Sequence, residues 1–293
     1  MQSHVSSQAV PPDEPAVPDL GTFGVWTTAP VTPEVAAEVE RLGYGAVWVS
    51  SVAPDDLSWV DLIFDRTTTL KAATGIINIW NTPAERAAEA YHRLDRDYPG
   101  RFVLGIGAGH REAITQWEKP FDALNAYLDD LDRHGVPAER RILAALGDGV
   151  LKLSARRGAG AHPYLTTPEH TARARELMGV NAFLAPEQKI VLSDDAAESR
   201  AAGRAALDLY LGLANYRNSW KRIGFEDDDI VKPGSDALVD AVIAYGTVDE
   251  IANRLRRHRE AGADHVAIQV IGTADPLPAL TTLAPALGLS PRS

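Results

Sequence analysis

The chain has 293 residues, of which 45% are hydrophobic and 24% are charged, a composition typical of a globular protein with a large core. Its formal net charge of -11 at pH 7 repels phosphate backbones and argues against a nucleic-acid-binding protein. Because the sequence contains no cysteine, disulfides, thiolate metal sites and cysteine nucleophiles are excluded, and no apolar run is long enough to predict a membrane span.

The first 18 residues are rich in proline and acidic side chains. They lack the basic region and the following apolar stretch that mark a signal peptide. We therefore expect a flexible tail over residues 1–18, a single domain over residues 19–293 and a cytoplasmic location.

In the first half of the chain, short apolar runs alternate with amphipathic segments. The apolar runs, which we predict to be strands, occupy residues 20–26, 45–50, 71–80 and 102–109. The amphipathic segments, which we predict to be helices, occupy residues 32–42, 55–70, 82–99 and 121–133. Thr32 and Thr82 are each followed by proline, a combination typical of a helix N-terminus, and Glu85 completes a capping box with Thr82.

The second half continues the alternation with more irregularity. The predicted strands occupy residues 141–146, 161–165, 188–192 and 265–271. The predicted helices occupy residues 150–157, a segment that begins at 167, and residues 194–213, 236–245, 247–261 and 276–287, with a connection over 216–229. Eight strands alternating with helices predict an α/β fold, a (β/α)8 TIM barrel with insertion segments. An open doubly wound sheet is the alternative, but residues 21–24 lack its usual glycine-rich turn.

Four segments carry a family pattern in a fixed order. They are ATGIINIW with TPAERAAEA from residue 73, RFVLGIGAGH with KPFDALNAYLDDL from residue 101, GAHPYLTTPEHTARARELMG with APEQKIVLSDD from residue 160, and the stretch over residues 215–271. Together they resemble the luciferase-like family, which includes monooxygenases, and in particular its branch of coenzyme F420-dependent oxidoreductases found in actinobacteria. The resemblance covers nearly the whole chain beyond residue 20.

This resemblance implies an enzyme that moves a hydride between the deazaflavin coenzyme F420 and a small organic substrate, and that pairs as a homodimer. In a parallel barrel the ligand site lies at the carboxyl ends of the strands. The residues that would bind the cofactor there are Trp26, Ser50, Gly75, Ile76, Asn78, Gly107, Ala108, Gly109, Gly147, Asp148, Gly149 and His162. We expect the deazaflavin ring to lie across the third and fourth strands.

The step from Gly75 to Ile76 lies where related enzymes have a non-prolyl cis peptide, which forms a bulge behind the deazaflavin ring. From the sequence alone, a glycine within a strand indicates a bulge, a close backbone approach or a tight place in the barrel. Asn78 faces the same way as Ile76 and, by the resemblance, would hydrogen-bond the polar edge of the ring. Gly107 and Gly109 leave room for a flat group, or relieve crowding inside the barrel.

Gly147, Asp148 and Gly149 precede a predicted helix. The free backbone N–H groups of a helix N-terminus suit a phosphate, and the resemblance places the phosphate of the coenzyme at this turn. A carboxylate beside a phosphate is repulsive, so Asp148 would have to point away. An ordinary strand–helix turn is the alternative.

His110 and Ser51 are the candidate catalytic residues. His110 follows the fourth strand, and an imidazole pKa of about 6.5 suits a proton donor, although a loop histidine in solvent is the alternative. Several related F420 enzymes have an acidic residue or a histidine after the second strand. This chain has Ser50 and Ser51 there, and serine is a poor base near neutral pH.

Trp80 and Tyr164 are the candidate substrate-binding residues. Tyr164 follows the sixth strand, where His162 could serve as a second acid. Trp80 and Trp26 stand at strand ends and would wall the deazaflavin, although tryptophan more often packs in a core or at its rim.

Several other histidines lie on predicted helices or outer positions and are expected to be structural, so no metal site is predicted: His92, His134, His170, His258 and His265. We expect no nucleic-acid or membrane partner. Two alternatives keep the fold and change the function. One is an FMN-dependent monooxygenase that uses molecular oxygen. The other is a non-catalytic F420-binding protein, which the two serines after the second strand favour.

Overall fold

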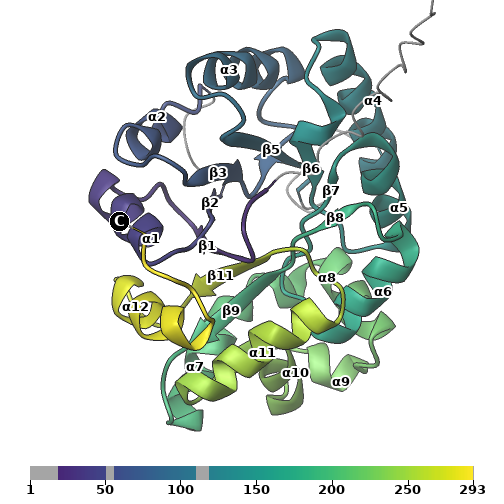
Figure 1. Ribbon diagram of the computed structural model, residues 1–293. Helices are drawn as coiled ribbons and strands as arrows, with labels where there is room; N and C mark the ends of the chain where they lie inside the picture. The colour runs from purple at the N-terminus through teal and green to yellow at the C-terminus, as the bar shows by residue number, and fades with distance from the viewer. Residues whose placement is uncertain (1–18, 51–55, 110–118, 293) are drawn as a thin grey trace, which may run out of the picture.

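The structure is a computed structural model that describes residues 19–50, 56–109 and 119–292. The strands in this part of the chain are β1 (Phe23–Thr27), β2 (Ala46–Val49), β3 (Lys71–Thr74), β4 (Ile77–Asn78), β5 (Phe102–Gly107), β6 (Arg141–Leu143), β7 (Gly160–Ala161), β8 (Phe183–Leu184), β9 (Glu187–Val191), β10 (Ile243–Tyr245) and β11 (Val266–Val270). They form a parallel sheet in the order β10–β9–β11–β1–β2–β3–β5–β6–β7–β8, and β4 pairs with β5 (Figure 1).

The sheet curls on itself because β8 and β9 are two parts of one extended segment. β8 pairs with β7, whereas β9 pairs with β11. Across the interruption, the Glu187 N–H donates to Pro163 O at 2.8 Å and the Asp264 N–H donates to Leu184 O at 2.8 Å. When β3 and β4 are also taken as one broken strand, eight strand positions enclose the barrel, and β10 lies beside β9. The predicted barrel-type α/β fold is confirmed.

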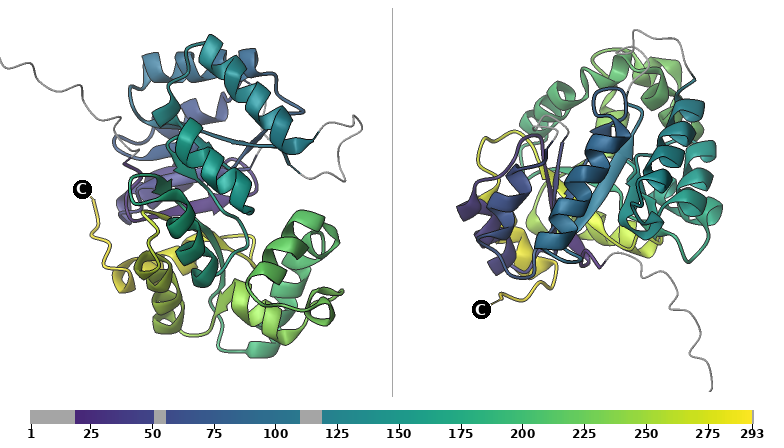
Figure 2. Two further views of the ribbon diagram at one scale, coloured as in Figure 1. Left: turned by 90° about the vertical axis from the view of Figure 1, so that its right-hand side faces the viewer. Right: turned by 90° about the horizontal axis from the view of Figure 1, so that it is seen from above.

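The helices cover the outside of the sheet (Figure 1). They are α1 (Pro33–Arg41), α2 (Trp59–Phe64), α3 (Ala84–Asp97), α4 (Pro120–Arg133), α5 (Asp148–Arg157), α6 (Pro168–Met178), α7 (Ala196–Leu207), α8 (Ala214–Arg222), α9 (Asp227–Ile230), α10 (Asp236–Val242), α11 (Val248–Glu260) and α12 (Leu277–Ala286), with 3-10 turns η2 (Ala138–Arg140) and η3 (Tyr210–Gly212). The green helices of residues 196–242 stand together at one side of the barrel (Figure 2).

Threonine caps start three of the helices as predicted. Thr32 Oγ1 accepts a hydrogen bond from the Val35 N–H at 3.3 Å at the start of α1. Thr167 caps α6, and Thr247 forms a reciprocal capping box with Glu250 at the start of α11. These side chains satisfy backbone N–H groups that the first helical turn leaves without partners. The first residues of these helices are therefore determined by neighbouring residues in the sequence.

Two elements in the first half differ from the prediction. The third strand is not continuous over residues 71–80, because β3 and β4 are separated by Gly75 and Ile76, which are joined by a cis peptide bond. The cis bond itself was expected from the resemblance and is confirmed. The helix predicted over 55–70 is shorter, since α2 begins at Trp59 and ends at Phe64. α3 starts at Ala84, with Pro83 rather than Thr82 in the cap position.

The segment between β9 and α11 is more divided than predicted. The helix predicted over residues 194–213 ends at Leu207 in α7 and is followed by the 3-10 turn η3. Residues 216–229, predicted as a connection, lie mostly in α8 and α9. The helix predicted over 236–245 ends at Val242, and the next three residues form β10.

Apolar side chains fill both the barrel and the layer between the sheet and the helices. All of β2 is buried, as its continuous apolar run predicted. The barrel interior includes Trp48, Val103 and Phe183. The C-terminal segment lies beside α1, where the Arg292 N–H donates to Arg41 O at 2.9 Å. No helix in the described part of the chain is long and apolar enough to cross a membrane.

Candidate functional site

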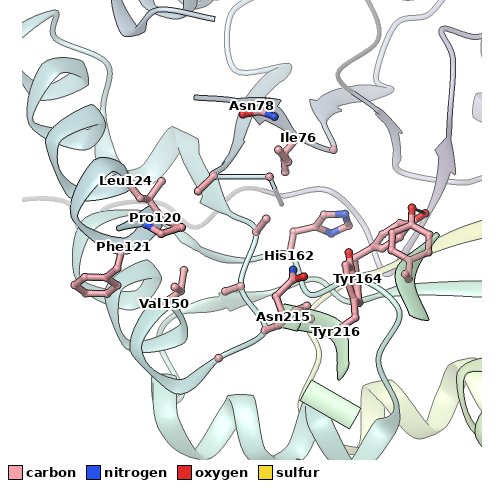
Figure 3. Close-up of a pocket in the computed structure, with 18 of the residues that line it drawn as sticks. Ile76, Asn78, Pro120, Phe121, Leu124, Val150, His162, Tyr164, Asn215 and Tyr216 are labelled. Carbon is pink, nitrogen blue, oxygen red and sulfur yellow. Dashed lines mark hydrogen bonds between the residues drawn. The ribbon is translucent and has the colours of Figure 1, made fainter. Parts of the chain in front are cut away.

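A cavity of about 420 Å³ opens at the carboxyl ends of the barrel strands (Figure 3). Ten of the predicted site residues line it: Trp26, Ser50, Gly75, Ile76, Asn78, Ala108, Gly109, Gly147, His162 and Tyr164. They follow or end β1, β2, β3, β4, β5, β6 and β7. The sequence therefore placed most of its candidates at one cavity, because parallel strands all end at the same mouth.

Other predicted site residues do not line the cavity: Gly107, Trp80, Asp148 and Gly149. A Cβ at Gly107 would meet Ala144 Cβ at 2.9 Å, so this glycine relieves crowding between neighbouring strand segments. Trp80 braces the loop after β5, since its Nε1–H donates to Ala108 O at 2.7 Å. Gly149 faces the Phe121 ring. His110 and Ser51, the catalytic candidates, lie outside the described residues.

At two of the cavity glycines a neighbouring side chain lies so close to the backbone that a Cβ would not fit. A Cβ at Gly75 would lie 2.5 Å from Trp26 Nε1, and one at Gly109 would lie 2.7 Å from Asn78 Nδ2. Gly109 also has a φ of 60°, which disfavours any residue with a side chain. The two glycines thus hold one edge of the cavity open between β3, β4 and the end of β5.

His162 is buried in a fixed orientation at the cavity. Its ring stacks on Trp48 with centroids 4.3 Å apart and planes at 10°. Its Nδ1–H donates to Ala185 O at 2.7 Å, which leaves Nε2 as a hydrogen-bond acceptor. Burial lowers the pKa of His162 to about 4, so the ring is neutral near pH 7. This geometry favours His162 as a hydrogen-bond acceptor rather than as the second acid that its sequence position suggested.

Two buried ring nitrogens at the cavity have no hydrogen-bond partner among the described residues. They are the Nε2 acceptor of His162 and the Nε1–H donor of Trp26, whose side chains are 2% and 5% exposed. Buried polar atoms are nearly always paired in folded proteins. One donor and one acceptor left over at a cavity with a mainly apolar lining fit a ligand that carries both kinds of group, as a flavin or deazaflavin ring does.

A buried polar network lies behind Tyr164. Lys189 Nζ donates to Tyr164 Oη at 2.6 Å, to Gln269 Oε1 at 2.7 Å and to Glu187 Oε1 at 3.1 Å. Burial lowers the pKa of Lys189 to about 8 and raises that of Glu187, while each charge favours the ionised form of the other. Sequence reasoning missed this network. The sequence feature that could have predicted it is the pair of charged residues Glu187 and Lys189 in a buried strand, because residues two apart lie on the same face.

The turn before α5 offers a second polar feature. Gly147 is the N-cap of α5 and supplies no side-chain cap, so backbone N–H groups of the first turn remain available. The Arg222 guanidinium lies 3.8 Å from the place that a Cβ on Gly147 would take. Asp148 pairs with Arg173 at 2.6 Å on α6. The Asp148 carboxylate is thus directed to α6, so it would not repel a phosphate at this turn. For the same reason its side chain no longer belongs to the predicted cofactor-binding set.

Three further elements line the cavity and were not predicted. α4 contributes Pro120, Phe121 and Leu124, the start of α5 contributes Val150, and the segment from η3 into α8 contributes Tyr210, Ala214, Asn215 and Tyr216. Figure 3 shows the α4 residues on one side of the cavity and the tyrosines on the other. The sequence analysis did not predict these contributions, because it considered the ends of the strands and these residues lie mainly on helices.

Four of the five histidines predicted to be structural have ring nitrogens within hydrogen-bond distance of other protein groups. His258 bridges Thr171 Oγ1 and Gln188 Oε1, and His265 bridges Trp48 Nε1 and Gly21 O. His170 Nε2 is 3.0 Å from Leu146 O, and His92 Nε2 is 2.8 Å from His134 O. Within residues 19–50, 56–109 and 119–292, no group of three or more His, Cys, Asp or Glu side chains is arranged to hold a metal.

Part of the chain matches a known protein family, and the barrel fold matches solved structures over most of its length. Residues 19–133 match the family described as luciferase-like monooxygenase. No curated protein matches the chain. The chain is similar to the crystal structure of apo-MsnO8, with 21% identity, a TM-score of 0.69 and coverage of 92% of this chain and 99% of that one.

Two other solved structures with the same fold have different cofactors in their descriptions. An F420-dependent secondary alcohol dehydrogenase in complex with an F420-acetone adduct has 14% identity, a TM-score of 0.69 and coverage of 91% of this chain and 98% of that one. The FMN complex of the oxygenating constituent of 3,6-diketocamphane monooxygenase from Pseudomonas putida has 14% identity, a TM-score of 0.65 and coverage of 90% and 96%. At these identities the likeness concerns the fold.

Proposed function

We propose that this chain is a luciferase-like oxidoreductase that binds coenzyme F420 and transfers a hydride between it and a small organic substrate. The observation that carries the proposal is the cavity at the barrel mouth, with its bulge at Gly75 and Ile76 and two buried ring nitrogens without protein partners. The match of residues 19–133 to the luciferase-like family supports the same class of enzyme.

The residues present fit a cofactor with a flat ring and a phosphate. Gly75, Ile76, Asn78 and Gly109 would border the ring, where the close backbone leaves a flat space. The start of α5 and the Arg222 guanidinium would hold the phosphate, because N–H groups and a cation both favour an anion. When bound, the deazaflavin supplies the hydride donor or acceptor.

The protein's own part is to position groups and to exclude water. The apolar lining from α4 and α5 shields the cavity, while His162 Nε2 would accept a hydrogen bond from an N–H or O–H group of the bound molecule. His110 is retained as the proposed proton donor on the basis of its sequence position.

An FMN-dependent monooxygenase is the second candidate, favoured by the fold likeness to an FMN-bound monooxygenase. The same cavity would hold either ring. Direct binding measurements separate the two candidates, because each coenzyme can be offered alone.

The test is to titrate the purified chain with F420 and, separately, with FMN while following tryptophan fluorescence. We expect quenching by F420 with a dissociation constant in the micromolar range or below and no response to FMN. Trp26→Phe should lose part of the quenching, because Trp26 lines the cavity, whereas Trp59→Phe on α2 should retain it. Response to FMN alone would move the assignment to the monooxygenase. Silence with both coenzymes would refute both candidates.

A further inference from the structure

Four aromatic rings form one continuous side of the cavity. We call this set, Trp26, Tyr164, Tyr210 and Tyr216, the aromatic wall. Its ring centroids lie 5.0 Å apart for Trp26 and Tyr164, 5.6 Å for Tyr164 and Tyr210, and 4.8 Å for Tyr210 and Tyr216. β1, the loop after β7, η3 and α8 each contribute one ring, so the wall exists only in the folded barrel. Figure 3 shows Tyr164 and Tyr216 together on this side.

The hydroxyl groups of two wall tyrosines are bonded within the protein. Tyr164 Oη accepts from Lys189 Nζ at 2.6 Å and donates to Gln269 Oε1 at 2.9 Å. Tyr210 Oη donates to Tyr164 Oη at 3.4 Å. Because these bonds tie the two hydroxyls into the buried network, the two tyrosines offer mainly ring carbon to the cavity. The wall therefore recognises by apolar and ring–ring contact.

Buried contacts hold the wall in place from behind. Lys189 Nζ lies 3.8 Å from the centroid of the Tyr164 ring. Tyr216 packs on Trp220 with centroids 5.8 Å apart, and Trp220 Nε1–H donates to Leu165 O at 3.1 Å, which ties α8 to the loop after β7. A wall that is already ordered loses little side-chain entropy when a rigid molecule binds to it.

The wall lies apart from most residues proposed to hold the cofactor. The residues proposed to border the ring come from the ends of β3, β4 and β5, and the proposed phosphate site combines the start of α5 with Arg222 at the far end of α8. Trp26 is the residue that belongs to both sets. The geometry points to the aromatic wall as the substrate subsite, which accepts a planar conjugated molecule such as a fused-ring phenol. This inference rests on the proposed function, because it assigns the remaining side of the same cavity to the substrate.

The test compares two alcohols that share a carbon skeleton and a hydroxyl group but differ in flatness, naphthol and decahydronaphthol. Calorimetric titration of the full chain without cofactor should show naphthol binding at least about tenfold tighter, since only its aromatic rings can make offset-stacked and edge-to-face contacts with the tilted rings of the wall. Equal affinities, or tighter binding of the saturated alcohol, would overturn the inference.

A variant pair ties the selectivity to the wall. Tyr210→Leu removes one ring at a partly exposed position and should weaken naphthol binding by roughly fivefold to tenfold while leaving decahydronaphthol unchanged. Tyr98→Leu is the matched control, because Tyr98 follows α3 and does not line the cavity. Equal naphthol affinity in the wild type and Tyr210→Leu would also overturn the inference.

A last measurement separates this inference from the cofactor assignment. With F420 at saturation, naphthol should retain its affinity, because the two molecules would occupy neighbouring parts of the cavity. Displacement of naphthol by F420 would assign the wall to the cofactor ring and refute the subsite. If F420 does not bind while naphthol keeps its selectivity and its dependence on Tyr210, the cofactor proposal fails and the subsite stands.

Discussion

The ion pair of Glu187 and Lys189 is fully enclosed, with an Nζ–Oε1 distance of 3.1 Å. Charges removed from water are tolerated only when their remaining hydrogen-bonding capacity is also met. Lys189 has three acceptors, and Glu187 Oε2 accepts from the Leu165 N–H at 3.0 Å. The pair therefore connects β9 to the loop that carries Tyr164, so a structural feature of the barrel also positions a cavity residue.

Removing one partner of this pair should be more harmful than replacing both. We expect Lys189→Met to lower the free energy of unfolding by about 3–5 kcal/mol, because it leaves the Glu187 carboxylate buried without a cation. The double variant with Glu187→Gln should recover most of that loss, since neither remaining group is charged. Urea unfolding of the wild type, both single variants and the double variant measures the coupling. A double variant no more stable than Lys189→Met would contradict this account.

The sequence predicted the location of a cavity residue where that location depends only on the residue's place along a strand. Gly75, Asn78 and His162 were expected at the barrel mouth, and in the structure each stands at or just beyond the end of a strand and lines the cavity. The role of His162 could not be predicted in the same way. Its proton position and low pKa depend on Ala185 and Trp48, which come from distant segments and meet it only when the barrel closes.

At the scale of elements, helices with their own start signals were predicted well, and helices held by tertiary contacts were not. α8 begins after Leu213 without a side-chain cap, and its sequence is polar. It is stabilised by burial of Tyr216 and Trp220, whose i, i+4 spacing was the one local sign of a helix. At the break of the third strand, Gly75 lies so close to Trp26 that a Cβ would not fit, and this contact joins two segments that are distant in the sequence.

The proposed phosphate site at the N-terminus of α5 can be tested by changing the cation beside it. Arg222→Gln should raise the dissociation constant for F420 by roughly tenfold, because an exposed cation beside the helix start is lost. The wild-type affinity should also fall with added salt more steeply than that of the variant. Titrations at low and high salt measure both effects.

Arg217→Gln is the control on the same helix, since Arg217 pairs with Asp227 on α9. We expect it to bind F420 as the wild type does. An identical affinity and salt dependence in Arg222→Gln and the wild type would place the phosphate elsewhere and leave the turn before α5 as an ordinary connection.

Among the described residues four histidines are buried, and three of them have the most strongly lowered pKa values. His162 lies at the cavity, His258 lies between α6, α11 and β9, and His265 lies near the amino end of β1 and β11. Burial is the largest cause of the lowered pKa in each, to about 4 for His162 and His265 and about 3 for His258. Each ring must gain a proton at mildly acidic pH once the chain unfolds, whereas the folded barrel keeps it neutral.

These pKa differences make stability depend on pH in a defined window. Below the ordinary histidine pKa of 6.5 the unfolded chain binds protons that the folded chain does not, so stability is full above pH 6.5 and is lost as pH falls toward 4. Each buried histidine should account for a loss of about 2 kcal/mol between pH 6.5 and pH 5. Urea unfolding at pH 7, 6 and 5 measures the slope. His258→Gln should make this slope shallower by the share of one histidine, because an amide can bond both Thr171 and Gln188 without titrating, and His92→Gln at an exposed position should not. A free energy of unfolding that stays constant from pH 7 to pH 5 would mean that these rings can take up protons inside the folded barrel.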